Sequence, residues 1–451
     1  MKERSFSLAL MLAVVALVFV PVAAHAQSAT PTPTATATPA GGCALTLPDG
    51  QPPNCRTGGY PPPAFLGISG GNINSVFIDP KSGVVGCCSG TLGALVQDAS
   101  PSPGATPAQY VLSTNHAFAR NGGRGARAKE AIVQPGPFDI GCWQAAEDTV
   151  AELSKWTTIN FKGKSNELDA AIARVVLAAD SPGGPLGPGV DTLGEIFNLG
   201  VEDETPGQIS TTPFPYDSLI DGLEVMKMGS SSCLTSGKVE AFDAMGIVNY
   251  QATCNAAGSG PATFDHQIIV VGQPFSGFSN TTCSFAANGD SGAVVLTYNP
   301  DSYQCLQAVG IVFAGSSGTD PDTAGVVVAV NPMQTPTHTG VLDKFHVSLV
   351  GDNSCTPPSP IGVAAHPIAR MSSAMHKSIN LVRKAKETYG HRLLKNHAVV
   401  AVGIATGDSP DTAVLNVYLS EDTPEIRSKV LKEIHNRSAV RFKHAAKFQA
   451  L

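Results

Sequence analysis

Between residues 64 and 353 the apolar positions fall in short runs rich in valine and isoleucine, separated by glycine, proline and asparagine. Runs such as 84–85, 267–271, 293–296 and 326–330 are too short for helices. Their length and spacing are typical of antiparallel strands joined by turns. We therefore predict a mainly β domain over 64–353.

The last 91 residues, 361–451, have a different pattern. Apolar residues first recur at helical spacing and then alternate as in strands. Thr423 precedes Pro424, the combination of a helix N-cap and a first-position proline. The predicted elements are a helix over 368–389, strands over 398–405 and 412–419, a helix from 424 and a strand near 440–442. Together they predict a small C-terminal α/β module, in which we recognise no active-site pattern.

The N-terminal segment indicates export. Lys2 and Arg4 precede a short apolar run over 8–20, and Ala-His-Ala at 24–26 has the form of a cleavage site. A membrane anchor is the alternative, but the run is short and ends at Pro21. We predict a signal peptide over 1–26, no transmembrane span and a secreted or periplasmic chain. Residues 27–63, rich in threonine and proline, are predicted to be an extended linker.

Ten cysteines in an exported chain indicate disulfides rather than thiol chemistry. Zinc is the alternative, but no Cys-x-x-Cys pair with a nearby histidine supports it, so no metal and no cofactor is expected. Connectivity cannot be deduced from sequence. Short loops suggest the pairs Cys43–Cys55, Cys233–Cys254 and Cys283–Cys305.

Charge is unevenly distributed. Residues 361–451 hold 14 Lys and Arg against 7 Asp and Glu, a balance of +7, and since the whole chain carries −7 the remainder carries −14. The basic residues form either an ordinary solvated helix face or a surface by which the module docks on the β domain over 64–353 or on a partner. They are not interleaved with aromatic residues, so nucleic-acid binding is not predicted.

A candidate nucleophile, Ser291, lies in the turn sequence Gly-Asp-Ser-Gly at 289–292, directly before an apolar run. A serine hydroxyl needs a base to take its proton, and the base needs a carboxylate to orient it and stabilise its charge. His116, after an apolar run, and Asp169, between apolar residues, are the candidates. The order His, Asp, Ser is that of chymotrypsin and differs from subtilisin and the α/β-hydrolases.

Each residue also has a simpler explanation. Gly-Asp-Ser-Gly is a common surface turn, Asp169 could cap a helix beginning at Ala170, and a histidine after a strand is often a boundary residue. Beyond the N-terminal segment, only His116 and His266 precede Ser291. His266 has no acid in the expected order except Asp290, so His116 is the predicted base.

Two further segments carry a family resemblance. Gly-Ile-Val-Phe-Ala-Gly-Ser at 310–316 resembles the strand that lines the substrate pocket of trypsin-like peptidases, and 88–96 resembles the strand before their catalytic histidine. The chain thus resembles the chymotrypsin/trypsin-like serine peptidase family. More narrowly, 227–230, 233–239 and 168–173 resemble a bacterial branch related to plant narrow-leaf-type proteases.

The resemblance implies a chymotrypsin-like double β-barrel with the site in the cleft between the barrels. It implies a serine endopeptidase that acts on polypeptides, with His116, Asp169 and Ser291 as catalytic residues. The backbone N–H groups of Gly289 and Ser291 would form the oxyanion hole. It also places Phe285 at the floor of the substrate pocket and Phe313 and Gly315 on its wall, which favours small or apolar side chains.

One departure concerns activation. Trypsin-like zymogens release an amino terminus that pairs with the acid before the serine, here Asp290, and no such cleavage segment precedes Cys88. Asp290 needs another partner or only holds the turn, and constitutive activity and activation by a partner both stay open.

Two other functions are alternatives to a peptidase. One is a catalytically silent polypeptide-binding module, and the other is an esterase with the same triad, although Ala293 breaks the GxSxG elbow.

Overall fold

The structure is a computed structural model, and all the residues that it describes fall within 36–451. It describes residues 43, 45, 63–78, 85–120, 124–142, 148–176, 189–200, 205–219, 221–250, 259–274, 282–299, 303–316, 325–335, 340–357, 371–409, 411–435 and 439–451. The predicted signal segment and nearly all of the predicted linker lie outside these ranges. So does residue 361, where the α/β module is predicted to begin, and the domain limits stay a prediction.

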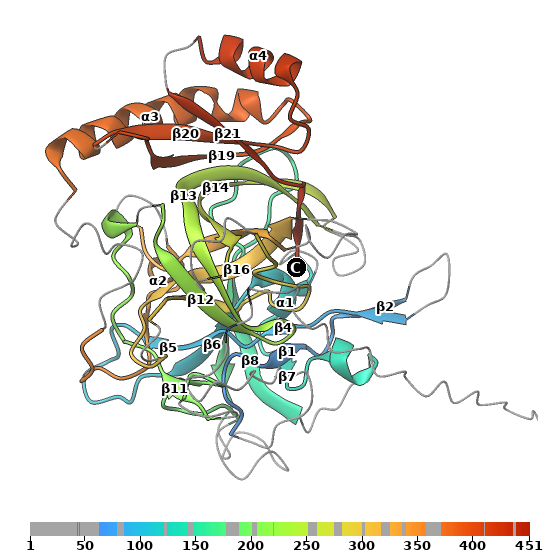
Figure 1. Ribbon diagram of the computed structural model, residues 1–451. Coiled ribbons are helices and arrows are strands. Elements are labelled where there is room, and N and C mark those ends of the chain that lie inside the picture. The colour runs from blue at the N-terminus through green and yellow to red at the C-terminus, as the bar shows by residue number, and fades with distance from the viewer. Residues whose placement is uncertain are drawn as a thin grey trace, which may run out of the picture. The chain divides into compact units, whose positions relative to one another are not determined.

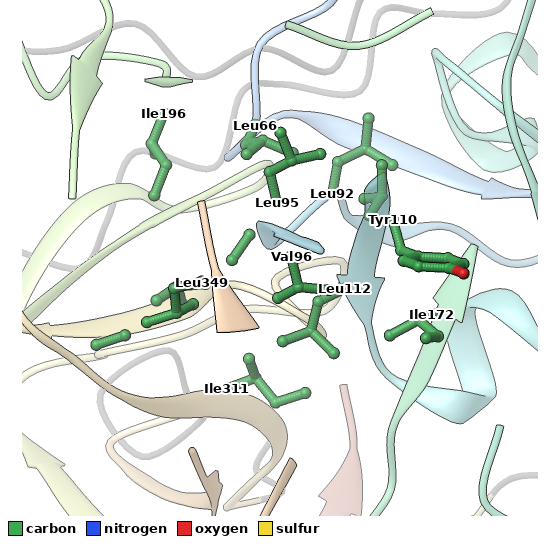
Figure 2. Packing of buried hydrophobic residues seen from close by; sticks show 14 of the residues in the cluster. Leu66, Leu92, Leu95, Val96, Tyr110, Leu112, Ile172, Ile196, Ile311 and Leu349 are labelled. Carbon is green, nitrogen blue, oxygen red and sulfur yellow. The ribbon is translucent and has the colours of Figure 1, made fainter. Parts of the chain in front are cut away.

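The first large sheet has eight strands among the described residues, every neighbouring pair antiparallel. In sheet order they are β18 (Val347–Leu349), β5 (Ala94–Asp98), β6 (Gln109–Ser113), β9 (Ala171–Val175), β8 (Thr149–Trp156), β7 (Ala131–Val133), β1 (Ser69–Asn72) and β4 (Gly90–Thr91). Leucine, isoleucine and valine side chains from these strands, with Ile311 from the second sheet, pack into one buried cluster (Figure 2).

The second large sheet has ten strands in the described part of the chain. In sheet order they are β12 (Glu224–Gly229), β15 (Val294–Thr297), β16 (Ala308–Ser316), β17 (Val327–Pro332), β14 (Gly260–Gly272), β13 (Cys233–Tyr250), β19 (Val399–Thr406), β20 (Ala413–Leu419) and β21 (Val440–His444), with β22 (Phe448–Ala450) on both β13 and β16. Only β22 on β13 and β21 on β20 are parallel pairs among those described. Two further apolar clusters lie along this sheet.

The remaining elements are short pairs and helices. They are the strand pairs β2 (Val76–Ile78) with β3 (Val85–Cys87) and β10 (Glu195–Ile196) with β11 (Gly207–Gln208), the helices α1 (Asn115–Phe118), α2 (Val341–Phe345), α3 (Ser373–Leu393) and α4 (Pro424–Glu433), and the 3₁₀ helices η2 (Pro137–Ile140) and η5 (Tyr216–Ser218). No helix among the described residues combines the length and apolarity needed to cross a bilayer.

The mainly β fold is confirmed, and so are most of the individual elements. The runs 267–271, 293–296 and 326–330 lie in or overlap β14, β15 and β17. In the C-terminal part, β19, β20, α4 and β21 match the predicted elements, and the Thr423 side chain caps α4 by accepting from the Ile426 N–H. The helix predicted over 368–389 is found as α3, but it continues through Gly390 to Leu393, and residues 368–370 lie outside the described residues. Strand β22 was not predicted, because three residues carry too little periodicity.

The C-terminal strands continue the second sheet. β19 pairs with β13 over Phe242–Gly246, and Figure 1 shows α3 and α4 beside β19–β21. The buried Lys386 of α3 places its ammonium 2.7 Å from a carboxylate oxygen of Asp243 and 2.7 Å from one of Asp265. A buried ammonium requires such partners, so this contact fixes α3 on β13 and β14.

Two of the three suggested disulfides are wrong. The structure pairs Cys43 with Cys283, Cys87 with Cys142 and Cys305 with Cys355, at sequence separations of 240, 55 and 50. The suggested pairs favoured short loops, whereas the sheet brings distant segments together. The third suggestion, Cys233–Cys254, involves Cys254, which lies outside the described residues; Cys233 itself is disulfide-bonded.

Candidate active site

His116 lies at the start of the short helix α1, just after strand β6 of the first sheet. The strand is the one predicted from the apolar run, and it ends at Ser113. His116 is 5 % exposed, and the Tyr250 ring lies edge-on to its imidazole with 5.9 Å between centroids. The imidazole is therefore enclosed and has few orientations open to it.

Asp169 lies directly before β9 and is fully buried. Its carboxylate accepts hydrogen bonds from the Asn115 backbone N–H at 2.7 Å and the Tyr250 hydroxyl at 2.5 Å. Its backbone pairs with the side-chain amide of Asn331 in both directions, at 3.0 and 2.8 Å. The alternative that Asp169 caps a helix is wrong, because a strand follows it.

Burial raises the pKa of Tyr250 well above its usual value, and the charge and hydrogen bond of Asp169 raise it further. The hydroxyl therefore stays protonated and donates to the Asp169 carboxylate. Tyr250 ends β13 and Asn331 lies in β17, so both residues reach Asp169 from the second sheet. Asp169 is thus fixed to both sheets at once.

Ser291 lies in the turn before β15 and is fully buried. Its Oγ is 2.6 Å from Nε2 of His116, while Nδ1 of His116 is 2.7 Å from the Asp169 carboxylate. The structure thus brings the three predicted residues together in the order carboxylate, imidazole, hydroxyl. Burial acts to lower the pKa of His116, but the charge and hydrogen bond of Asp169, together with the Leu451 carbonyl, raise it above its ordinary value.

The two glycines beside the serine are required by the backbone. Gly289 has a φ of +102° and Gly292 a φ of +95°, a backbone conformation that residues other than glycine rarely adopt. A Cβ at Gly289 would lie 2.3 Å from Oγ of Ser231, and one at Gly292 would lie 2.1 Å from Oγ of Ser113. The turn therefore takes this conformation only because both positions lack side chains.

Asp290, which needed a partner, has one in Lys227. Both side chains are fully buried, with 3.1 Å between the ammonium and the carboxylate. The same ammonium also lies 2.6 Å from Oγ of Ser232 and 3.1 Å from the Cys233 carbonyl, so its donors are satisfied. Burial acts to lower the pKa of Lys227, opposed by the charge of Asp290. The partner of Asp290 is thus an internal lysine.

The carboxylate of Asp290 also organises the neighbouring loop. It accepts from the backbone N–H groups of Ser231 at 2.9 Å, Ser232 at 3.2 Å and Ala287 at 2.9 Å. Ser232 adds a hydrogen bond through its hydroxyl. One buried ion pair therefore fixes both the turn that carries Ser291 and the loop after β12.

The predicted pocket residues lie in two places. Phe285 is fully buried, its carbonyl accepts from Oγ1 of Thr235 at 2.6 Å, and its ring lies 5.7 Å from the ammonium of Lys227. Phe313 and Gly315 lie in β16, where the Phe313 ring packs against Phe264 with 4.8 Å between centroids. Their roles toward a substrate stay predictions.

Leu451 also belongs to the site, although no sequence pattern predicted it. Its carbonyl oxygen accepts a hydrogen bond from Oγ of Ser291 and lies 3.0 Å from Nε2 of His116. Its N–H donates to the Phe313 carbonyl at 3.3 Å. Figure 1 shows this end of the chain beside β16 and α1.

The other histidine, His266, also has an acid, Asp243, at 2.7 Å from its Nδ1. With Asp265 these residues place three potential metal-ligand atoms within 4.8 Å of one another. Lys386, however, already supplies a positive charge to both carboxylates. Cys305, Asp352 and Cys355 form a second such group, but the two cysteines are bonded to each other. Neither group has the chemistry of a free metal site.

Comparisons with known proteins give limited likenesses. No family model matches the chain, and no curated protein matches it. Solved structures that align with it include Thermobifida fusca protease A, with 13 % identity, 64 % of this chain and 98 % of that chain covered and a TM-score of 0.33. A glutamic-acid-specific serine protease has 18 % identity, coverage of 63 % and 100 % and a TM-score of 0.34, and a Cellulomonas bogoriensis chymotrypsin has 16 % identity, coverage of 64 % and 99 % and a TM-score of 0.33.

At these scores the likeness is too low to support an inference about this chain. The structures named are serine proteases, and none bears on the plant-related branch, which stays a prediction. The site is therefore interpreted from its own geometry.

The Lys227–Asp290 pair generates a prediction for stability. Lys227→Met removes the cation and leaves a buried carboxylate, which should lower the free energy of unfolding by about 3–5 kcal/mol. Urea unfolding measures this change. Lys238→Met, on a half-exposed lysine 3.7 Å from Glu224, is the control and should cost under about 1 kcal/mol. Adding Asp290→Asn to Lys227→Met should restore part of the loss; equal stability of Lys227→Met and the parent would contradict the role given to this pair.

Proposed function

We propose that this chain is a serine endopeptidase of the chymotrypsin-like type, exported from the cell, that hydrolyses peptide bonds through an acyl-enzyme. The observation that carries the proposal is the buried relay of Asp169, His116 and Ser291, with 2.7 and 2.6 Å between successive partners. A serine within hydrogen-bond reach of an imidazole, itself oriented by a carboxylate, is the arrangement that activates a hydroxyl for attack.

In the proposed reaction, Oγ of Ser291 attacks the substrate carbonyl carbon while its proton moves to Nε2 of His116. The substrate oxygen becomes negatively charged, and the N–H groups of Gly289 and Ser291 stabilise it. His116 then gives its proton to the leaving amine, and an ester links the acyl group to Ser291. A water molecule, deprotonated by His116, hydrolyses that ester and restores the serine.

The Asp169 carboxylate accepts a hydrogen bond from the Nδ1–H of His116, which leaves Nε2 free to accept. Tyr250 acts as a positioning residue in this scheme, because its hydroxyl donates to the same carboxylate. A carboxylate with several donors keeps its charge and its orientation when the imidazole becomes positive. Buried Lys227 keeps the Ser291 turn in place without a released amino terminus, which supports activity without cleavage of the chain.

Two features support a polypeptide substrate outside the cell. β16 pairs through its last residues with the extended segment Phe448–Ala450, as it would with an extended polypeptide, and the described residues contain disulfides, which persist in oxidising compartments. The signal pattern over 1–26 is the basis for export. A catalytically silent binding module and an esterase remain the outcomes that would replace the proposal.

The relay predicts covalent reaction at one serine. A fluorophosphonate probe should label the purified chain, and Ser291→Ala should abolish labelling while leaving thermal unfolding unchanged, since only a hydroxyl is lost. His116→Ala should reduce labelling nearly as much, because triad members act as a unit. His266→Gln is the control, because His266 also pairs with an aspartate, Asp243, but does not belong to the relay of Asp169, His116 and Ser291.

Absence of labelling in every form would favour the silent binding module. Turnover of ester substrates without any turnover of peptides would favour the esterase.

The raised pKa of His116 predicts the pH profile. Only the neutral imidazole accepts the serine proton, so the rate rises with pH as His116 loses its own proton. Because its pKa is above the ordinary histidine value of about 6.5, half-maximal kcat/KM should fall above that pH. Peptide hydrolysis measured from acid to neutral pH tests this. A midpoint well below the ordinary histidine value would contradict the charge environment assigned to His116.

The hydrogen bond from Tyr250 predicts a kinetic effect. Tyr250→Phe removes a donor to a buried carboxylate, and such bonds contribute about 1.5–3 kcal/mol, so kcat should fall about tenfold or more with little change in KM. Tyr110→Phe is the matched control, because its hydroxyl lies 3.3 Å from another aspartate, Asp98. If both variants kept the parent kcat, Tyr250 would have no positioning role.

A further inference from the structure

Strand β22 lies between two strands of the second sheet. It pairs in parallel with the end of β13, through Val248 and Asn249, and antiparallel with the end of β16. On β16 the register sets Ala314 opposite Ala450, Gly315 opposite Gln449 and Ser316 opposite Phe448. The segment Phe448–Leu451, called here the tail peptide, therefore runs in extended form along the strand that leads away from the candidate site.

The end of the tail peptide reaches the reacting groups. The Leu451 carbonyl oxygen accepts from Oγ of Ser291 and lies 3.0 Å from Nε2 of His116. The Leu451 N–H donates to the Phe313 carbonyl at 3.3 Å. In the mechanism proposed above, the substrate carbonyl group also has to come within reach of Ser291 Oγ and His116 Nε2. The tail peptide thus occupies the side of the cleft that holds the residues before a cleaved bond.

The Leu451 side chain is largely enclosed, with 9 % exposed. Its Cγ and both Cδ atoms lie 3.0–3.3 Å from the position that a Cβ on Gly315 would occupy. The absence of a side chain at residue 315 therefore makes room for a branched aliphatic group at this position. Leu451 also belongs to the apolar cluster that includes Phe285, the residue predicted at the pocket floor.

The tether to the tail peptide is short. β21 is paired with β20 through His444, and the Ala445 N–H donates to the Leu419 carbonyl at 3.0 Å. Only residues 446 and 447 separate this anchor from Phe448, which is buried against β13. A segment tethered so closely acts at an effective concentration of about 1 mM or more, far above ordinary levels of a free substrate.

We propose that the tail peptide is an intramolecular substrate mimic that occupies the cleft and restrains the peptidase, and that the peptidase accordingly prefers extended polypeptides with leucine before the cleaved bond. This proposal rests on the proposed function. Strand addition to β16 supplies affinity through backbone hydrogen bonds, and the leucine site supplies selectivity. Displacement of the tail peptide, by substrate or by a partner, frees Ser291.

The first experiment compares four forms of the chain by their rate of fluorophosphonate labelling: the parent, a form lacking 448–451, Leu451→Asp and Lys447→Asp. Leu451→Asp puts a charge into an apolar site but keeps the chain length, so it carries the test if the shortened form fails to fold. Lys447→Asp puts the same charge on an exposed neighbour. The form lacking 448–451 and Leu451→Asp should label about tenfold faster or more than the parent, since both remove a competing tail peptide with an effective concentration of about 1 mM. Lys447→Asp should match the parent.

The second experiment tests selectivity in the unblocked forms. A peptide p-nitroanilide with Phe-Gln-Ala-Leu before the cleaved bond should be hydrolysed at least tenfold faster, by kcat/KM, than the same compound with Arg or Asp in place of Leu. A free peptide of residues 445–451 should inhibit competitively, and its Leu→Asp version should not.

A binding measurement separates the failure of this proposal from that of the proposed function. In the Ser291→Ala background, a fluorescent peptide of residues 445–451 should bind the Leu451→Asp form and be excluded from the form with an intact tail, whether or not the chain is an enzyme. Binding with this pattern but no labelling of any form with Ser291 would overturn the function and keep the occupied cleft. Equal labelling rates in all four forms, or equal peptide binding with and without an intact tail, would overturn the proposal. Faster cleavage after Arg or Asp would overturn the leucine preference.

Discussion

The Asp169 carboxylate is fully buried, and a buried carboxylate has to be surrounded by donors if it is to keep its charge. Its donors come from α1 through Asn115 and His116, and from β13 through Tyr250. Asn331 of β17 holds its backbone. Satisfying this single group therefore fixes the two sheets against each other at one point. His116 and Ser291 are aligned as a result, because His116 follows β6 of the first sheet and Ser291 precedes β15 of the second.

Asp290 imposes a second constraint of the same kind, one residue before the serine. Asp169 is held mainly by hydrogen bonds, whereas Asp290 has a full cation in Lys227. A buried ion pair contributes little net stability compared with apolar packing, but it defines one geometry sharply. Here that geometry is the turn in which Gly289 and Gly292, both with positive φ, flank Asp290 and Ser291. The two buried acids thus have separate roles: Asp169 orients His116, and Asp290 shapes the turn that carries Ser291.

The site residues that could be predicted from the sequence are those whose neighbours in the chain form a recognisable pattern. His116 follows a readable strand, Ser291 lies in a glycine-rich turn before another, and chain order selected Asp169 as their partner. Sequence reasoning left open whether Asp290 has another partner or only holds the turn, and it could not name Lys227. Tyr250, Asn331 and Leu451 carry no local signal, since each reaches the site through pairings between strands far apart in the chain. The disulfide suggestions failed for the same reason: loop length is local, but the Cys43–Cys283 pair depends on how the sheet closes. The α/β part was predicted well because helix periodicity and the Thr423 cap are local properties.

The junction between β13 and β19 has a consequence for solubility. β13 is 18 residues long, and β19 covers its edge over Phe242–Gly246, where it would otherwise present unpaired backbone N–H and C=O groups. Exposed strand edges of this kind recruit other chains and initiate aggregation. The helices and strands after residue 371 therefore shield the long strand β13 from self-association, in addition to anything that the last residues do at Ser291. A chain shortened before β19 would lose that shield, together with the lysine that neutralises Asp243 and Asp265, and should be more prone to assemble edge to edge.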